Sequence, residues 1–270
     1  MKFSVLMSVY QADNPVFFGQ ALQSIVMSTI TPTELVLVCD GKLTAELEQV
    51  IDNYQHKLPI NLLRLDNNVG LGLALQAGLK HCTYEWVARF DADDICCDDR
   101  FAKQIVFLKS NPNIDVLGGQ ILEFNEYPNE ENIIKKRVPL QHERIKKYAS
   151  SRNPVNHMTV MFRKSTVLEA GNYQHAPLYE DYDLWIRMLL NGYRFTNISD
   201  VLVYARAGNE MYKRRGGLSY ARQEIKMQMK FQKSGFISST CLIKNLMVRV
   251  PIRLMPNSLR KIAYSKFLRH

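Results

Sequence analysis

The chain has 270 residues, of which 46% are hydrophobic and 23% charged, so the composition predicts a folded globular protein and excludes wholesale disorder. Its net charge of +9 is unevenly spread: residues 1–213 hold 22 Lys and Arg against 25 Asp and Glu, and residues 214–270 hold 13 against Glu224 alone. The sequence has no visible signal peptide and no apolar run of about 18 residues that would span a membrane, and its five cysteines, without CxxC spacing, predict free thiols rather than disulfides or a zinc site.

Short apolar runs alternate with stretches of helical periodicity in the first half of the chain. The pattern predicts strands over 3–9, 35–39, 60–65, 86–90 and 116–117, and helices over 16–27, 44–54, 71–82 and 99–109. Continuous apolar strands that alternate with helices indicate an α/β fold whose sheet is covered on both faces. Ligands of such sheets bind beyond the carboxyl ends of the strands, so the residues that follow each strand are the first candidates for a site.

The regular alternation stops after the strand at 116–117. Residues 120–150 are polar and charged, and predict a loop or lid with little core of its own. Beyond them the pattern predicts a strand over 159–162, a helix over 180–190 and a strand over 201–205. From Tyr220 onward the chain reads as helical, with breaks at Gly235, Pro251 and Pro256.

Three aspartates, Asp91, Asp93 and Asp94, follow directly on the predicted strand 86–90. Side chains at i and i+2 of an extended chain point to the same side, so Asp91 and Asp93 converge. Converging carboxylates repel unless a cation joins them, and hard divalent cations prefer oxygen ligands. The alternative, an acid-rich turn that opens the next helix, does not explain acids placed tightly against a buried strand. We therefore predict a divalent metal site at Asp93 and Asp91.

Other polar residues at the ends of predicted elements are weaker candidates. Asp40 is suited to a ribose or a base edge, although an aspartate before glycine is also an ordinary turn former. The glycine-bearing run around Asn68 is suited to phosphate but lacks the established phosphate-loop patterns. Glu180 and Asp181 begin a helix, where acids also complement the helix dipole. His157 opens a predicted strand, and a lone histidine is more often structural than functional.

Several segments, taken in this order, resemble the family 2 inverting glycosyltransferases of the GT-A fold. The segments are SVLMSVY, LVLVCDG, DNNVGLGLALQAGL, VARFDADD, NPVNHMTVMFRK and YEDYDLWIRML, and they lie within roughly residues 1–210. The resemblance is greatest to the branch that builds bacterial exopolysaccharide, capsule and lipopolysaccharide. It implies a Rossmann-like, mostly parallel sheet flanked by helices. It also implies a catalytic domain over 1–213, with a nucleotide-binding half (1–118) and an acceptor half (119–213), and a basic helical extension over 214–270.

The resemblance also implies roles for individual residues. Asp181 matches the catalytic base, with Glu180 as its weaker neighbour. Asp93 and Asp91 would bind Mn²⁺ or Mg²⁺ on the donor diphosphate. Donor contacts are expected for Tyr10, Asp40, Asn68, Arg89, Asp91, His157 and Arg214, the last in a segment (206–217) that is expected to close over the donor.

The implied reaction moves one sugar, with inversion, from a nucleoside-diphosphate sugar to a glycan acceptor. UDP is the expected nucleotide, and a polyprenyl diphosphate is the expected carrier of the acceptor. The chain lacks the QxxRW motif of the processive synthases. A rival enzyme class, the sugar-nucleotide nucleotidyltransferases, would need a phosphate loop where Tyr10-Gln11-Ala12-Asp13 stands. A second rival is a basic-tailed scaffold or nucleic-acid-binding protein, but no recognition helix is evident, and we expect no nucleic acid partner.

The basic C-terminal segment includes CLIKNLMVRVPIRLMP, which interleaves apolar residues with Lys244, Arg249 and Arg253. A helix of this kind is suited to lying on an anionic membrane surface. The alternative is a helix packed on the catalytic domain with its basic face in solvent. Free thiols and a basic tail together lead us to expect a cytoplasmic protein that binds the inner face of the cell membrane peripherally.

Overall fold

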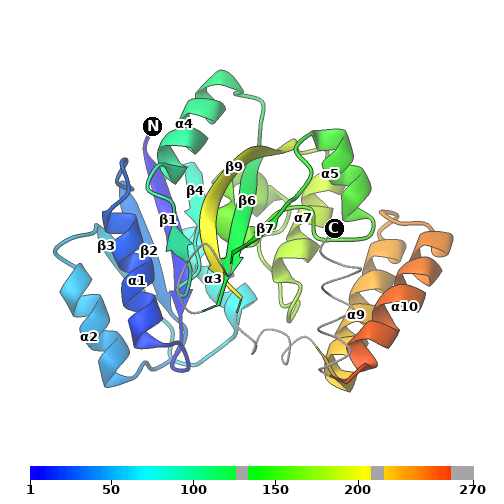
Figure 1. Cartoon of the computed structure of the whole chain (residues 1–270), viewed down its shortest axis with the longest axis horizontal. Coiled ribbons are helices and arrows are strands. Elements are labelled where there is room, and N and C mark those ends of the chain that lie inside the picture. The colour runs from blue at the N-terminus through cyan, green and yellow to red at the C-terminus, as the bar shows by residue number, and fades with distance from the viewer. Residues whose placement is uncertain (126–132, 208–215, 257–270) are drawn as a thin grey trace.

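The computed structural model describes residues 1–125, 133–207 and 216–256, and Figure 1 shows their arrangement. One curved sheet of nine strands runs through the molecule, with helices on both sides. The strand order is β3-β2-β1-β4-β8-β6-β9-β5, and β7 pairs with β6. Within these ranges no helix has the length and apolarity that a membrane crossing requires. All five cysteines are free thiols, as predicted.

The first half of the chain forms the parallel part of the sheet. Its strands are β1 (Phe3–Val9), β2 (Glu34–Cys39), β3 (Ile60–Arg64) and β4 (Trp86–Arg89), and its helices are α1 (Pro15–Val26), α2 (Ala45–Tyr54), α3 (Leu71–His81) and α4 (Arg100–Ser110). All of β2 and all but one residue of β1 are buried, as expected for strands covered on both faces. The predicted elements of this half are confirmed, and their ends differ by at most one residue.

The second half of the sheet is mixed, so the prediction of a mostly parallel sheet holds only in part. β8 (Met161–Arg163) runs antiparallel between β4 and β6 (Val116–Phe124). The long strand β9 (Phe195–Arg206) is parallel to β6 but antiparallel to β5 (Ile95–Cys96). The predicted strand at 159–162 begins later than expected because His157–Thr159 forms a turn of 3₁₀ helix. The expected domain boundary at residue 118 falls inside β6, and the division into halves stays a prediction.

The predicted loop over 120–150 is wrong for its described part. That part contains the rest of β6, β7 (Ile134–Lys136) and α5 (His142–Ala149). The continuation of β6 beyond residue 117 was not predicted, because its glycine and polar residues do not form an apolar run. A Cβ at Gly119 would lie 2.5 Å from Leu202 of β9, so glycine permits the close approach of the two strands. The buried amide of Gln120 bonds the backbone of Val138 and Ile198, and thereby replaces ladder bonds at an irregular register.

Two hydrophobic cores lie on opposite faces of the sheet, because successive strand residues point to opposite sides. Val5 and its neighbours on one face pack against α1, α2 and α4. Leu6 and the other face pack against α3, α5, α6 (Lys164–Glu169), α7 (Glu180–Leu190) and α9 (Leu218–Lys233). The second core therefore joins the sheet and its helices to the C-terminal part of the chain.

The C-terminal helices α9 and α10 (Ser239–Leu254) lie side by side at one edge of the molecule (Figure 1). Phe231 of α9 packs its ring edge-on against Tyr182 of α7, and Lys230 pairs with Asp183 at 2.5 Å. The turn at Gly235 separates the helices as predicted, whereas Pro251 does not end α10, which continues to Leu254. The packing expected in the alternative is confirmed, since Asn245 of α10 donates to the backbone carbonyl of Ser150 at 2.8 Å. The expected basic face in solvent is not confirmed, because Arg249 and Arg253 pair with buried Glu224.

Candidate active site

A cavity of about 320 Å³ lies beyond the carboxyl ends of β1, β2 and β4. This is the edge of the sheet at which the sequence pattern predicts a ligand site. Five residues assigned there from the sequence line the cavity: Tyr10, Asp40, Asn68, Asp91 and Asp93. They come from four separate segments, so the fold alone brings them together.

Asp40 follows β2 and fixes the loop that precedes α3. Its carboxylate oxygens accept hydrogen bonds from the backbone N–H groups of Val69 at 2.7 Å and Gly70 at 3.0 Å. The side-chain amide of Asn68 donates to the backbone carbonyl of Asp40 at 3.3 Å. A Cβ at Gly41 would lie 2.7 Å from the backbone nitrogen of Asn68, which explains the glycine. The predicted contact of Asp40 with a nucleotide sugar would use the carboxylate lone pairs that these bonds leave over. This contact stays a prediction.

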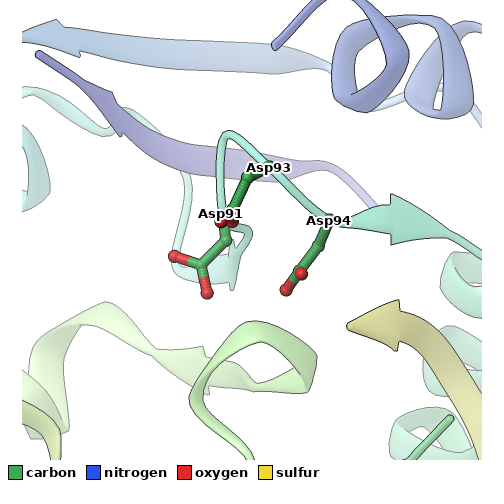
Figure 2. Close-up of side chains that lie close together, drawn as sticks. All are labelled: Asp91, Asp93 and Asp94. Atoms are coloured by element: carbon green, nitrogen blue, oxygen red, sulfur yellow. The ribbon is translucent and has the colours of Figure 1, made fainter. Parts of the chain in front are cut away.

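The turn between β4 and β5 carries Asp91, Asp93 and Asp94 (Figure 2), whose carboxylate oxygens lie within 4.8 Å of one another. Asp94 is buried, and its Oδ1 accepts a hydrogen bond from the backbone N–H of Arg206 at 2.8 Å. Its Oδ2 has no hydrogen-bond partner among the described residues. Burial, and then the charges of Asp91 and Asp93, raise the pKa of Asp94 well above its usual range. Three crowded carboxylates with an open buried oxygen fit a hard divalent cation.

Arg89, the last residue of β4, connects this acidic turn to a second cavity. Its buried guanidinium forms an ion pair with Asp91, while Nε and Nη1 have no partner within the described ranges. Arg100 donates to the carbonyl of Arg89 at 2.8 Å and lies over the ring of Phe90, which fixes the end of the strand. A buried guanidinium with open donors suits an anionic ligand.

The second cavity, of about 340 Å³, lies beside the first. Leu71 and Asp91 line both cavities, so the two adjoin each other, and together they are called the cleft. Residues assigned to the site from the sequence that line the second cavity are Arg89, Asp91, His157, Glu180 and Asp181. The cleft therefore holds a metal-type acid cluster at one end and a pair of carboxylates at the other.

Asp181 lies in the first turn of α7, where the helix dipole favours negative charge. Its Oδ2 accepts a hydrogen bond from the side-chain amide of Asn153 at 2.5 Å, and its Oδ1 one from the backbone N–H of Tyr182 at 2.7 Å. Burial raises the pKa of Asp181, although Asn153, the Tyr182 N–H, Arg89 and Lys136 oppose the rise. A carboxylate held in one orientation with a raised pKa is suited to accepting a proton.

Glu180 precedes Asp181 on the same turn. Burial, and then the negative charge of Asp181, raises the pKa of Glu180 to about 7. Gly72 allows α3 to approach this turn, since a Cβ there would lie 3.0 Å from the Cβ of Glu180. At neutral pH the two adjacent carboxyl groups therefore carry less than two full negative charges.

His157 is buried in the cavity wall and is a poor candidate for a cationic phosphate contact. Its Nε2 lies 2.9 Å from the hydroxyl of Tyr173, and its ring meets Trp185 edge-on. Burial, and then the charge of Arg89, lowers the pKa of His157 well below its usual value. The imidazole is therefore neutral at physiological pH. The predicted contact of His157 with a nucleotide sugar stays a prediction.

Arg214 is the one predicted site residue that lies outside the described residues. The metal ligands assigned from the sequence left out Asp94, which belongs to the acid cluster, and sequence reasoning missed Asn153 and Lys136, which line the second cavity. Asp94 carried a signal, since it belongs to the same acidic run. No sequence pattern pointed to Asn153 or Lys136, because their partners lie far away in the sequence.

The chain is similar to known proteins over most of its length. The profile described as Glycosyl transferase family 2 matches residues 4–168. The UDP-Gal:alpha-D-GlcNAc-diphosphoundecaprenol beta-1,3-galactosyltransferase of Escherichia coli is 42% identical over 99% of this chain and 97% of that protein. The amylovoran biosynthesis glycosyltransferase AmsE of Erwinia amylovora is 39% identical over 98% of both chains. An uncharacterized glycosyltransferase of Haemophilus influenzae is 43% identical over the full length of both.

Solved structures share the fold at low sequence identity. S. aureus TarS 1–349 in complex with UDP-GlcNAc superposes with a TM-score of 0.69 at 19% identity, over 99% of this chain and 76% of that chain. The chain spans 46% of the longer TarS structure. The mannosyltransferase PcManGT from Pyrobaculum calidifontis, in complex with GDP-Man and Mn²⁺, gives a TM-score of 0.65 at 16% identity, over 98% of this chain and 75% of that chain. The likeness confirms the predicted GT-A fold.

Proposed function

This chain belongs to glycosyl transferase family 2, and from that membership we propose that it transfers one sugar from a UDP-linked donor, with inversion, to a glycan acceptor on a lipid diphosphate. The family decides against both rival classes, the nucleotidyltransferases and the non-enzymatic scaffold or nucleic-acid-binding proteins. The names of the Escherichia coli and Erwinia relatives support a role in surface polysaccharide synthesis.

The observation that carries the proposal is the cleft of two adjoining cavities with chemically different ends. The acidic end, with Asp91, Asp93 and Asp94, would hold Mn²⁺ or Mg²⁺ on the donor diphosphate. Bound there, the cation would stabilise the negative charge that develops on the leaving nucleotide. The opposite end holds Asp181, which is oriented by Asn153 and can face an acceptor hydroxyl.

In the proposed reaction Asp181 accepts the proton of the acceptor hydroxyl as that oxygen attacks the anomeric carbon of the donor sugar. The bond from that carbon to the diphosphate breaks as the new bond forms, so the configuration inverts. Asn153 keeps the Asp181 carboxylate in place during the transfer. Tyr10, Asp40 and Asn68 border the nucleoside end of the cleft.

The purified protein is expected to transfer sugar from a UDP-sugar to a synthetic GlcNAc-α-diphosphate-lipid in the presence of Mn²⁺. We would test UDP-Gal, UDP-GlcNAc, UDP-Glc and GDP-Man separately, follow the product by mass spectrometry, and determine its anomeric configuration by NMR. A β-linked product from an α-linked UDP-sugar would support the proposal. Transfer with retained configuration, or from GDP-Man alone, would contradict it.

We also propose that the outer face of α10 binds an anionic membrane surface. Ile243, Met247 and Leu254 recur on one side of this helix and are about half exposed or more, and exposed Lys244 lies beside them. Arg249 and Arg253, assigned to the basic outer face from the sequence, instead point inward and pair with Glu224. The basic contribution of this helix to membrane binding is therefore smaller than the sequence suggests.

The double variant Ile243→Glu, Met247→Glu should bind vesicles rich in phosphatidylglycerol at least about tenfold more weakly than the unmodified protein, because two apolar side chains can no longer insert. Co-sedimentation with vesicles measures the effect. Val106→Glu, at an exposed position of α4, is the matched control, and this variant should bind vesicles normally. Equal vesicle binding by all three proteins would exclude this face as the membrane contact.

A further inference from the structure

The second cavity has a wall that lies outside the segment matched by the family profile. Tyr220 of α9 and Arg249 and Arg253 of α10 line this cavity together with Asp181 and Lys136. The profile ends at residue 168, and the proposed chemistry uses none of these three C-terminal side chains. Two arginines in the wall of a catalytic cleft therefore call for an explanation.

Two arginines of this wall share one acid. The carboxylate of Glu224, which is fully buried, pairs with Arg249 at 2.8 Å and with Arg253 at 3.0 Å. Among the residues that the structure describes, these pairs set one carboxylate beside two guanidinium groups, and the two arginine side chains remain 14% and 9% exposed. Arg253 also lies over the ring of Tyr220 at 4.5 Å, which fixes its plane. A guanidinium has five N–H donors, so each arginine can contact phosphate oxygens in addition to Glu224.

The same network is connected to the residues around the proposed base. The hydroxyl of Tyr179 donates to Glu224 at 2.9 Å, and Tyr179 directly precedes Glu180. Arg249 donates to the backbone carbonyl of Ser151, close in sequence to Asn153, which orients Asp181. An anion bound by the arginines would therefore lie in the same cavity as the base.

Charges of both signs line the second cavity, where Glu180 and Asp181 lie with Arg249 and Arg253. At the acidic turn an anion can bind only with a metal cation, because the carboxylates there would otherwise repel it. At the C-terminal wall an anion meets arginines directly and needs no cation. Two anionic groups, one with a metal and one without, can therefore occupy one cleft at the same time.

We propose that Arg249 and Arg253, with Lys136 nearby, bind the diphosphate of the acceptor without a metal ion. The inference rests on the proposed function for the identity of the acceptor as a diphosphate ester. It gives the C-terminal helices a direct part in acceptor recognition. The arginines hold the charged end of the acceptor while its sugar hydroxyl reaches Asp181.

The test is calorimetric titration of inorganic pyrophosphate into the metal-free full-length protein in EDTA. The unmodified protein should bind pyrophosphate, and Asp93→Asn should bind it equally well. Arg249→Gln and Arg253→Gln should each weaken binding about tenfold or more, because a charge-assisted contact is lost. Arg222→Gln, an exposed arginine of α9, is the matched control and should not change binding.

UDP titrated with Mn²⁺ into the same variants separates this inference from the proposed function. UDP binding should survive in both arginine variants and fail in Asp93→Asn, the reverse of the pyrophosphate result. Failure of UDP binding by the unmodified protein would count against the proposed donor and leave the anion site intact. Absence of pyrophosphate binding in EDTA, or its loss in Asp93→Asn alone, would overturn the anion site.

Loss of Arg249 or Arg253 leaves a buried Glu224 with one counterion fewer and can impair folding. Arg249→Lys and Arg253→Lys keep a positive charge beside Glu224 but lose the planar fork. They should fold, bind UDP with Mn²⁺ normally, and bind pyrophosphate several-fold more weakly. Unchanged pyrophosphate binding in both lysine and both glutamine variants would show that the arginines serve only as counterions to Glu224.

Discussion

Asp181→Asn is expected to lower the turnover number by about 10²–10⁴-fold while UDP binding with Mn²⁺ stays unchanged. The substitution removes the proton acceptor but keeps the size of the side chain. The donor end of the cleft should be unaffected, since its acids belong to a different segment of the chain. Turnover would be measured by release of UDP and binding by calorimetry. A joint loss of UDP binding and turnover in this variant would count against Asp181 as the base.

Glu180→Gln is the matched control for that substitution, because it changes the adjacent carboxyl group on the same turn. It should retain most of the activity at alkaline pH. Burial, rather than the charge of Glu180, raises the pKa of Asp181, so the substitution should leave the pKa of Asp181 unchanged. The pH at which kcat/KM falls on the acid side should then be the same as in the unmodified protein. Complete loss of activity in Glu180→Gln, with activity retained in Asp181→Asn, would assign the base to Glu180.

Asp93→Ala is expected to abolish the gain in UDP affinity that Mn²⁺ provides, with a loss of at least about 100-fold. The loss of a partner outside the first ligand shell already costs 10–100-fold in metal affinity, and a direct ligand should cost no less. Transfer activity should fall with it. Calorimetric titration of UDP, GDP and dTDP, each with and without Mn²⁺, gives the nucleotide and the metal dependence in one series.

Asp98→Ala is the control for the metal site. Asp98 is an exposed acid shortly after the cluster and does not belong to it. Its removal should leave Mn²⁺-dependent UDP binding unchanged. Equal losses in Asp93→Ala and Asp98→Ala would indicate a general effect of negative charge on this turn rather than a bound cation.

The sequence predicted the parallel half of the sheet and the clustering of acids at one end of the cleft because both depend on local order. The strand β4 is buried throughout and apolar except for Arg89, and Asp91 and Asp93 follow it closely. The start of β6 was predicted over 116–117, but its continuation to Phe124 was missed because Gly119 and Gln120 are typical loop residues, and only the contact with β9 shows otherwise. Asn153 and Glu224 find their partners only in the folded chain, so no spacing rule could have assigned them.

The pairing of Glu224 also bears on the order in which the protein can be completed during synthesis. Glu224 leaves the ribosome before both of its arginines, which follow 25 and 29 residues later. Burying an acid without its counterions is costly. The hydrogen bond from Tyr179, the residue before α7, to Glu224 should then form only after Arg253 has left the ribosome. The wall formed by α9 and α10 should therefore be completed only after the whole sheet has been synthesised.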